Sequence, residues 1–361
     1  MDFPLAGLLA DIRLLVECES PSADAAAVER SAALVAQLGT RLLGAAPDRF
    51  GPAHLRWQFG GPARVLLLGH HDTVWPLGSL ATRPCTVEDG VLRGPGCFDM
   101  KAGLVMALHA VAALSDRSGV TVLVTGDEEI GSPTSRELIE STARGCAAVL
   151  VLEAAADSGA LKTERKGASN YQVRAAGRAA HAGLEPDRGV NASIELAHQL
   201  LAVTALGDAA LGTTVTPTVL AAGTTTNTVP AAGEFAVDVR ARTAAEQQRV
   251  DRAMHALRPV LPGAGLTVSG GPNRPPLSAD ASADLYRRAV KVAVAIGQEP
   301  PGQAAVGGAS DGNFTAGLGV ATLDGLGAIG GGAHADDEHV LAGTLPARAA
   351  LVAALVEDLL G

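Results

Sequence analysis

The first part of the chain alternates short, continuously apolar runs with longer stretches in which apolar residues recur at intervals of three and four. The longer stretches have the periodicity of amphipathic helices, because residues three and four apart share one helix face. The short runs end at glycine or an acidic residue and are typical of buried strands in a parallel sheet. We predict helices at 5–17, 25–44 and 101–114 and strands at 65–68, 120–124 and 147–152.

A different pattern begins at about Gly167, where polar and apolar residues alternate as they do in half-exposed strands. A helix capped by Asn191 is expected to extend to about Leu201. Near Asp280 the first pattern returns and continues to the end of the chain. The predicted elements of these two regions are strands at 171–174, 215–222 and 234–242 and helices at 281–296 and 345–360.

These patterns predict an α/β fold with two domains. The larger domain is expected to be a mostly parallel sheet with helices on both faces, formed by residues 1–167 and 279–361. A smaller α+β domain at residues 168–278 interrupts it. A chain of 361 residues, of which 47% are hydrophobic, is long and apolar enough to form both cores.

The charge balance narrows the class of partner. Lys and Arg number 28 against 38 Asp and Glu, which gives a formal net charge of −10. An acidic surface of this kind repels phosphate backbones and anionic lipids, so we expect no nucleic-acid or membrane partner. Small molecules or other proteins are the expected partners.

The cysteines and the N-terminus bear on the compartment. Four cysteines are scattered without a CxxC pair, which is typical of a reducing environment. The first residues lack the basic region of a signal peptide, and no apolar run approaches the roughly 18 residues of a membrane span. We therefore expect a cytoplasmic protein.

Side chains that can bind metal follow each of the predicted strands of the larger domain. In doubly wound sheets, functional groups gather beyond the carboxyl ends of the strands. A Gly-rich turn near the C-terminus supplies one more imidazole. The candidate residues are His70, His71, Asp72, Asp99, Asp127, Glu128, Glu129, Glu153 and His334.

Imidazoles and carboxylates that converge on one sheet edge predict a metal site. Several carboxylates so close together disfavour one another's ionisation, and a divalent cation removes that cost. Mixed histidine and carboxylate ligation suits Zn²⁺, with Co²⁺ or Mn²⁺ as substitutes, and a shared carboxylate can bridge two ions.

Local spacing separates some of the roles. Glu128 and Glu129 are consecutive at a strand end, so their side chains point to opposite sides, and one can bind metal while the other faces the attacking water. His70 and Asp72 are two residues apart and share a side, which lets Asp72 orient the imidazole.

Eight motifs occur in order between His70 and Val340. They are GHHDTV, GPGCFDMKAG, VTGDEEIGS, GRAAHAG, GTTTNTVP, VDVRA, GGASDGN and GGAHADDEHV. Taken together, these motifs resemble the M20 family of co-catalytic zinc metallopeptidases. This family includes glutamate carboxypeptidase, acetylornithine deacetylase, succinyl-diaminopimelate desuccinylase and aminoacylase, and the overall sequence pattern of this chain is most similar to the glutamate carboxypeptidase branch.

The resemblance implies a centre with two zinc ions. His70, Asp99 and Glu153 would hold one ion. Asp99, Glu129 and His334 would hold the other, so that Asp99 bridges the pair.

The resemblance also implies the reaction. The enzyme would cleave the amide bond of an N-acyl amino acid or short peptide with a free carboxylate, as glutamate carboxypeptidase does, by means of metal-activated water. Glu128 would be the general base, and Asp72 would orient His70.

The inserted domain is expected to be a lid and a homodimerisation domain. His181 would reach the active site of the partner subunit as an oxyanion donor, while Asn227 and Arg240 would contact the substrate and Gly308 would line the site. Each also has a structural interpretation. His181 can cap a turn, Asn227 can serve the turn before Val229, and Arg240 can pair with a carboxylate across the sheet.

Two other functions stay open at this point. One is a biosynthetic deacylase, similar to acetylornithine deacetylase, that releases a small acyl group. The other is a non-catalytic homologue that binds a metal or a ligand. The sequence does not give the acyl group, the amino acid released or the native metal.

Overall fold

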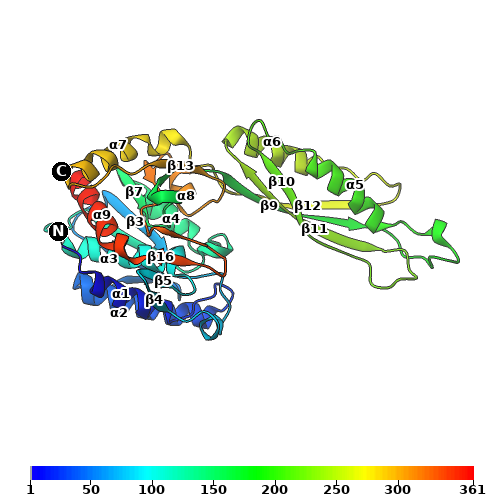
Figure 1. Ribbon diagram of the computed structural model, residues 1–361. Coiled ribbons are helices and arrows are strands. Elements are labelled where there is room, and N and C mark those ends of the chain that lie inside the picture. The colour runs from blue at the N-terminus through cyan, green and yellow to red at the C-terminus, as the bar shows by residue number, and fades with distance from the viewer. Residues whose placement is uncertain (1) are drawn as a thin grey trace. The chain divides into compact units, whose positions relative to one another are not determined.

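The computed structural model describes residues 2–361, which form two compact units. The first unit contains the residues up to Arg165 and the segment Leu277–Gly361, and the second unit is Lys166–Pro276. Both boundaries lie two residues before the positions expected from the sequence. Figure 1 shows the elements of each unit, coloured along the chain.

A six-stranded sheet forms the centre of the first unit. Strand β3 pairs in parallel with β6 and β7, and β14 is parallel to β7, whereas β2 is antiparallel to β6 and β1 is antiparallel to β2. The sheet is therefore mixed, with a parallel centre. In sheet order the strands are β1 (Asp48–Phe50), β2 (His54–Gln58), β6 (Val120–Thr125), β3 (Val65–His70), β7 (Ala148–Val151) and β14 (Thr322–Leu323).

Helices cover both faces of this sheet, because its strands are apolar on both sides. Val65 and Leu67 of β3 pack into one core, and Leu66 and Leu68 pack into another. The first core includes residues of α1 (Leu5–Val16), α2 (Ala25–Leu43), α3 (Ala102–Ala113), α7 (Ala279–Ala295) and α9 (Leu345–Leu360). The second includes residues of α4 (Arg136–Ala143) and α8 (Gly312–Gly317). The predicted α/β fold, with helices on both faces, is confirmed.

The first unit also contains two smaller sheets. One is antiparallel and consists, in sheet order, of β15 (Gly330–Gly331), β16 (His339–Leu341), β5 (Val91–Arg93) and β4 (Thr86–Glu88). The other is the parallel pair of β8 (Leu161–Arg165) and β13 (Gln303–Val306).

The second unit is an antiparallel sheet with two helices on one face (Figure 1). Tyr171, Phe235 and Val237 of the sheet share one core with Leu196 and Val250 of the helices. In sheet order the strands are β10 (Thr214–Ala222), β11 (Ala232–Ala241), β9 (Gly167–Ala176) and β12 (Gly265–Arg274), and the helices are α5 (Ala192–Thr204) and α6 (Ala244–His255).

The cap predicted at Asn191 is present at the start of α5. The side-chain oxygen of Asn191 accepts hydrogen bonds from the backbone N–H groups of Ser193 and Ile194, at 2.9 and 3.2 Å. These bonds satisfy two donors that the first helical turn leaves without a partner.

The chain leaves the first unit after Arg165 and returns to it at Leu277. The backbone N–H of Arg165 donates to the carbonyl of Leu277, and the N–H of Leu277 donates to the carbonyl of Arg165, each at 3.0 Å. The exit and the return therefore lie side by side.

Two further expectations concern the compartment. All four cysteines are free thiols. No helix in residues 2–361 combines the length and the apolar character that a membrane crossing requires. The cytoplasmic location stays a prediction.

Candidate metal centre

Three neighbouring strands of the central sheet end in candidate metal ligands. His70 is the last residue of β3, Glu128 and Glu129 follow β6, and Glu153 follows β7. Because β3 lies between β6 and β7 and all three are parallel, their carboxyl ends meet at one edge of the sheet. Sheet topology thus brings together residues that are far apart in the sequence.

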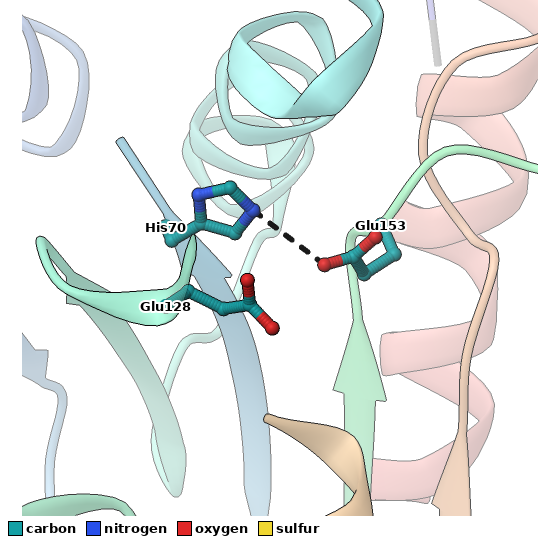
Figure 2. A group of neighbouring side chains, drawn as sticks. All are labelled: His70, Glu128 and Glu153. Atoms are coloured by element: carbon teal, nitrogen blue, oxygen red, sulfur yellow. Dashed lines mark ion pairs between the residues drawn. The ribbon is translucent and has the colours of Figure 1, made fainter. Parts of the chain in front are cut away.

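His70 is fully buried and faces two carboxylates. Its Nε2 atom lies 3.4 Å from Oδ1 of Asp99 and 3.5 Å from Oε1 of Glu153. Figure 2 shows the imidazole of His70 and the carboxylate of Glu153 on the two sides of this contact.

Asp99 joins this group to a second imidazole. One of its oxygens, Oδ1, faces His70, and the other, Oδ2, lies 3.3 Å from Nε2 of His334. The same nitrogen of His334 lies 3.2 Å from Oε2 of Glu129. One carboxylate that offers each oxygen to a different imidazole has the arrangement of a ligand that bridges two metal ions.

His334 differs from His70 in its surroundings. It lies in the loop between β15 and β16, its backbone φ is 61°, and its side chain is 50% exposed. Non-glycine residues seldom adopt positive φ values, and here a Gly-rich loop turns sharply at the imidazole. The two imidazoles of the cluster are thus unequal in access to solvent.

Glu128 lies in the same cluster. Its carboxylate offers an oxygen within 4.8 Å of ligand atoms of His70 and Glu153, and the three side chains point toward one another in Figure 2. His70, Asp99 and Glu129 form a second group with the same spacing. Both members of the Glu128–Glu129 pair therefore face the candidate centre. The expectation that they point to opposite sides assumed a strand end, whereas both residues belong to a 3₁₀ turn, Glu128–Ile130, in which side chains do not alternate.

The cluster contains polar atoms that a cation would satisfy. Within residues 2–361, Nε2 of His70, Oδ1 of Asp99 and Oε1 of Glu129 are buried and have no hydrogen-bond partner. Buried polar atoms without partners are costly, and these three belong to residue types that bind divalent metals. The residues present fit a centre of mixed nitrogen and oxygen ligands.

The electrostatics of the cluster lead to the same conclusion. Hydrogen bonds with Asp99 and Glu129 raise the pKa of His334 to about 10. Burial favours a higher pKa for Asp99, but the facing imidazoles of His334 and His70 lower its pKa well below the ordinary value. Positive charge is therefore favoured at this position, and divalent cations supply it.

Asp72 connects two parts of the site through hydrogen bonds and a close contact with His70. It is fully buried and accepts hydrogen bonds from the backbone N–H groups of Glu128 and Glu129, at 3.3 and 3.2 Å, and from the hydroxyl of Ser22 at 2.6 Å. Its Oδ1 lies 3.4 Å from Nδ1 of His70, whose closest partner is the backbone carbonyl of Asp72 at 3.0 Å. Asp72 thus fixes the His70 ring and the Glu128–Glu129 turn together.

Arg165 is a site residue that sequence reasoning did not predict. It is buried at the end of β8, with Nη2 3.3 Å from Oε2 of Glu153 and Nε 2.7 Å from Oδ2 of Asp324. Its Nη1 donates to the carbonyl of Gly308 at 3.1 Å. Gly308, the residue expected to line the site, is thus connected through Arg165 to the ligand candidate Glu153.

Glu338 is a second residue without an expected role. It is buried, and its carboxylate accepts hydrogen bonds from Trp75 Nε1 at 2.6 Å and from the backbone N–H groups of Gly96, Phe98 and Asp99 at 2.9, 2.9 and 3.1 Å. It therefore holds the loop that carries Asp99. The motif GGAHADDEHV contains Glu338 four residues after His334, and this is its signal in the sequence.

His181 and Asn227 lie beside each other in the second unit. The backbone N–H of Ala182 donates to the carbonyl of Asn227 at 2.9 Å. The exposed His181 accepts hydrogen bonds at Nδ1 from the backbone N–H groups of Gly183 and Leu184, at 3.1 and 3.2 Å. Because Nδ1 accepts these bonds, the ring proton of neutral His181 lies on Nε2.

Arg240 lies near the other end of the same sheet. In the pairing of β11 with β9, Ala232 lies opposite Ala176, and Arg240 lies opposite Ala168. Within residues 2–361, Arg240 forms an ion pair at 2.8 Å with Asp238 of its own strand and not with a carboxylate across the sheet. Arg240 lies eight residue steps along β11 from Ala232, which corresponds to roughly 26 Å at about 3.3 Å per residue.

The sequence is similar to characterised hydrolases. The chain is 33% identical over 315 residues to carboxypeptidase G2 of Pseudomonas sp. (strain RS-16), and the match covers 83% of this chain and 74% of that protein. It is 32% identical over 201 residues to succinyl-diaminopimelate desuccinylase 2 of Shewanella loihica, covering 50% of this chain and 53% of that protein.

The fold is similar to solved structures over nearly the whole chain. A tripeptidase from Staphylococcus aureus subsp. aureus mu50 superposes with a TM-score of 0.77 at 19% identity and 99% coverage of both chains. An M20 family metallo-carboxypeptidase from Sulfolobus solfataricus gives a TM-score of 0.75 at 16% identity, also with 99% coverage of both.

A family model supports the same assignment. Residues 66–358 match the model described as peptidase family M20/M25/M40, and this range contains the whole candidate centre. The protein is therefore a hydrolytic enzyme, and it belongs to peptidase family M20/M25/M40.

Proposed function

We propose that the protein is a binuclear zinc amidohydrolase that cleaves the amide bond of an N-acyl amino acid or short peptide with a free carboxylate. The observation that carries this proposal is Asp99, whose two oxygens face the imidazoles of His70 and His334 at 3.4 and 3.3 Å. The similarity to carboxypeptidase G2 supports the same reaction class.

The proposed ligands are five residues of the first unit. His70, Asp99 and Glu153 would hold one zinc ion, and Asp99, Glu129 and His334 would hold the other. When bound, zinc would polarise the substrate carbonyl and make water a better nucleophile near neutral pH. Co²⁺ or Mn²⁺ has compatible ligand preferences.

Glu128 is the proposed general base. Its buried carboxylate lies among the ligand candidates and would accept a proton from the attacking water, then donate that proton to the leaving amine. Asp72 would keep Glu128 in place through the backbone N–H that it accepts at 3.3 Å.

His181 is the proposed donor to the oxyanion, and Arg240 and Asn227 are the proposed substrate contacts. The turn at Gly183 and Leu184 leaves the proton of His181 on Nε2, which suits a hydrogen-bond donor. His181 and Arg240 belong to opposite ends of one sheet, so a substrate that meets both would take them from two copies of the chain. We therefore propose a homodimer in which the second unit acts as a lid and reaches the partner's site.

A mixing experiment tests the exchange of His181 between subunits. Glu128→Ala and His181→Ala homodimers should each be inactive. If His181 acts on the partner's site, random exchange of subunits at equal amounts should restore about one quarter of the wild-type activity, because half of the dimers then carry one complete site. A mixture without activity, at confirmed subunit exchange, would show that His181 does not act in this way.

The reaction itself is tested with zinc-loaded protein and a panel of N-acyl amino acids and dipeptides, with Glu128→Ala as the control. Release of a free amino acid from substrates that end in a carboxylate supports the proposal. Turnover confined to acetylated or succinylated amines would favour the second candidate, a biosynthetic deacylase, which the desuccinylase relative also supports. The non-catalytic hypothesis has no support from the family assignment.

A further inference from the structure

We propose that the first unit carries a pocket for a large apolar acyl group, immediately beside the metal centre. This inference rests on the proposed function and names the substrate class more closely: N-acyl amino acids whose acyl chain is longer than acetyl. The pocket has a volume of about 500 Å³, which lies within the range of small-molecule sites.

Apolar side chains form the rim of this acyl pocket. Val74, Leu77 and Ile130 line it and are 44, 50 and 56% exposed, and Pro21 and Pro76 add further apolar surface. Large apolar side chains that are exposed together around one cavity mark a binding surface more often than chance placement does.

The position of the acyl pocket links it to the chemistry. Glu129, the candidate ligand that faces His334 at 3.2 Å, is one of the lining residues, and Ile130 follows it directly in the chain. An acyl group whose carbonyl carbon lies at the metal centre therefore has its chain within reach of the pocket.

Ser22 and Thr73, which also line the acyl pocket, are joined by hydrogen bonds to the proposed catalytic residues. The N–H of Thr73 donates to the carbonyl of Ser20 at 2.8 Å, and the N–H of Ser22 donates to the carbonyl of Thr73 at 3.1 Å. The hydroxyl of Ser22 donates to Asp72, which in turn holds Glu128 and Glu129. The acyl pocket is thus formed before substrate arrives, which lowers the entropic cost of binding.

The charges of the side chains that line the acyl pocket determine which end of the substrate enters it. Among the described residues that line the acyl pocket, Asp24 and Glu129 are acidic and none is basic. Asp24 already accepts a hydrogen bond from the N–H of Ala27 at the start of α2. No cationic side chain among these lining residues can pair with the free carboxylate of the substrate, so the apolar acyl end is the one that fits.

The test compares N-acetylglutamate with N-octanoylglutamate on zinc-loaded protein. In wild-type enzyme, kcat/KM for the octanoyl substrate should exceed that for the acetyl substrate at least about tenfold, because several additional methylene groups leave water. Ile130→Ser and Leu77→Ser should each reduce this ratio about tenfold. Leu14→Ser, which changes a leucine of α1 that is 43% exposed, is the matched control and should leave the ratio unchanged.

Several results would overturn the proposal. A wild-type ratio near one, or a ratio that Ile130→Ser and Leu77→Ser change no more than Leu14→Ser does, excludes an acyl pocket here. Loss of self-association in Ile130→Ser, at an unchanged ratio, would assign the surface to a contact between copies of the chain.

Direct binding separates failure of the acyl pocket from failure of the proposed function. Calorimetric titration of N-octanoylglutamate into zinc-loaded Glu128→Gln protein should give binding that an added Ile130→Ser substitution weakens about tenfold. This result without any hydrolysis by wild-type enzyme would retain the pocket and reject the amidohydrolase. Absence of binding, with zinc bound, would reject the pocket.

Discussion

The two units hold their candidate functional residues in different ways. In the first unit, Asp72 and Glu338 are buried, and each accepts hydrogen bonds from groups far away in the sequence. In the second unit, His181 is exposed and is fixed by the two N–H groups that follow it, and Arg240 pairs with a residue two positions away. A centre of several charges needs positions fixed from many sides, whereas one turn suffices to present a single donor.

This difference predicts how substitutions behave. Changes in the first unit should alter metal affinity or stability together with activity. Changes at the exposed residues of the second unit should alter activity alone.

The largest expected effect is at Glu128. Glu128→Gln should lower kcat by about 10²–10⁴-fold, because the amide cannot accept the proton of the attacking water. Zinc content, measured by atomic absorption, should stay at the wild-type value. Loss of a zinc ion in this variant would instead make Glu128 a ligand, in keeping with its place among the ligand atoms of His70 and Glu153.

The next effect tests the second unit. His181→Ala should lower kcat by about 10²–10³-fold through loss of the oxyanion donor. Its midpoint of thermal unfolding should not change, since the exposed imidazole of His181 accepts its two hydrogen bonds from its own turn. His198→Ala, which changes an exposed histidine of α5, is the control and should retain full activity. A fully active His181→Ala enzyme would remove this residue from the mechanism.

A smaller effect on metal affinity is expected at Glu338. Glu338→Gln keeps the shape of the side chain but replaces an acceptor of four hydrogen bonds with one that accepts fewer, so the Asp99 loop should loosen. Competition with a chelator should reveal a zinc affinity about 10- to 100-fold lower than in wild-type protein. Asp337→Asn, an exposed neighbour in the same loop, should match wild type. Equal affinities in the two variants would deny Glu338 this positioning role.

The smallest effect concerns the stability of the second unit at low pH. Hydrogen bonds with Arg249 and Thr213 lower the pKa of Glu246 to about 2, from an ordinary value near 4.5. Its stabilising contribution is therefore complete above pH 4.5 and is lost as the pH falls toward 2.

Urea unfolding provides the measurement. Glu246→Gln should be less stable than wild type by about 1 kcal/mol at pH 7, and the difference should shrink toward zero as the pH approaches 2. Glu185→Gln, which alters an exposed ion pair with Arg188, should show little difference at either pH. A difference that does not depend on pH would contradict the assigned pKa.

Sequence reasoning located the candidate ligands because their signals are local. His70 ends an apolar strand, Glu153 lies two residues after one and Glu129 lies four residues after one, and strand order then brings them to one edge. Arg165 and Glu338 were not predicted, because their contacts join residues that are far apart in the sequence. Arg165 contacts Gly308, more than 140 residues away, and Glu338 contacts the Asp99 loop, about 240 residues away. No local pattern encodes such contacts.

Several elements were missed for a similar reason. Helix α6 has few apolar residues for a periodic signal, with Val250 and Met254 as its buried apolar side chains. Strand β12 contains Gly270, Gly271 and Pro272, residues that disfavour strands, and its pairing with β9 keeps it extended. In both elements, contacts with the rest of the fold determine the secondary structure.

The adjacent positions of Arg165 and Leu277 have a consequence for the history and engineering of the chain. Two backbone hydrogen bonds join the residues where the second unit is spliced into the first. Gene segments are most readily gained or lost where the two ends of the insert already meet, since the host needs no rearrangement to accommodate them. The first unit, closed by a short linker between these residues, is therefore a natural minimal protein in which to test the proposed metal binding without the second unit.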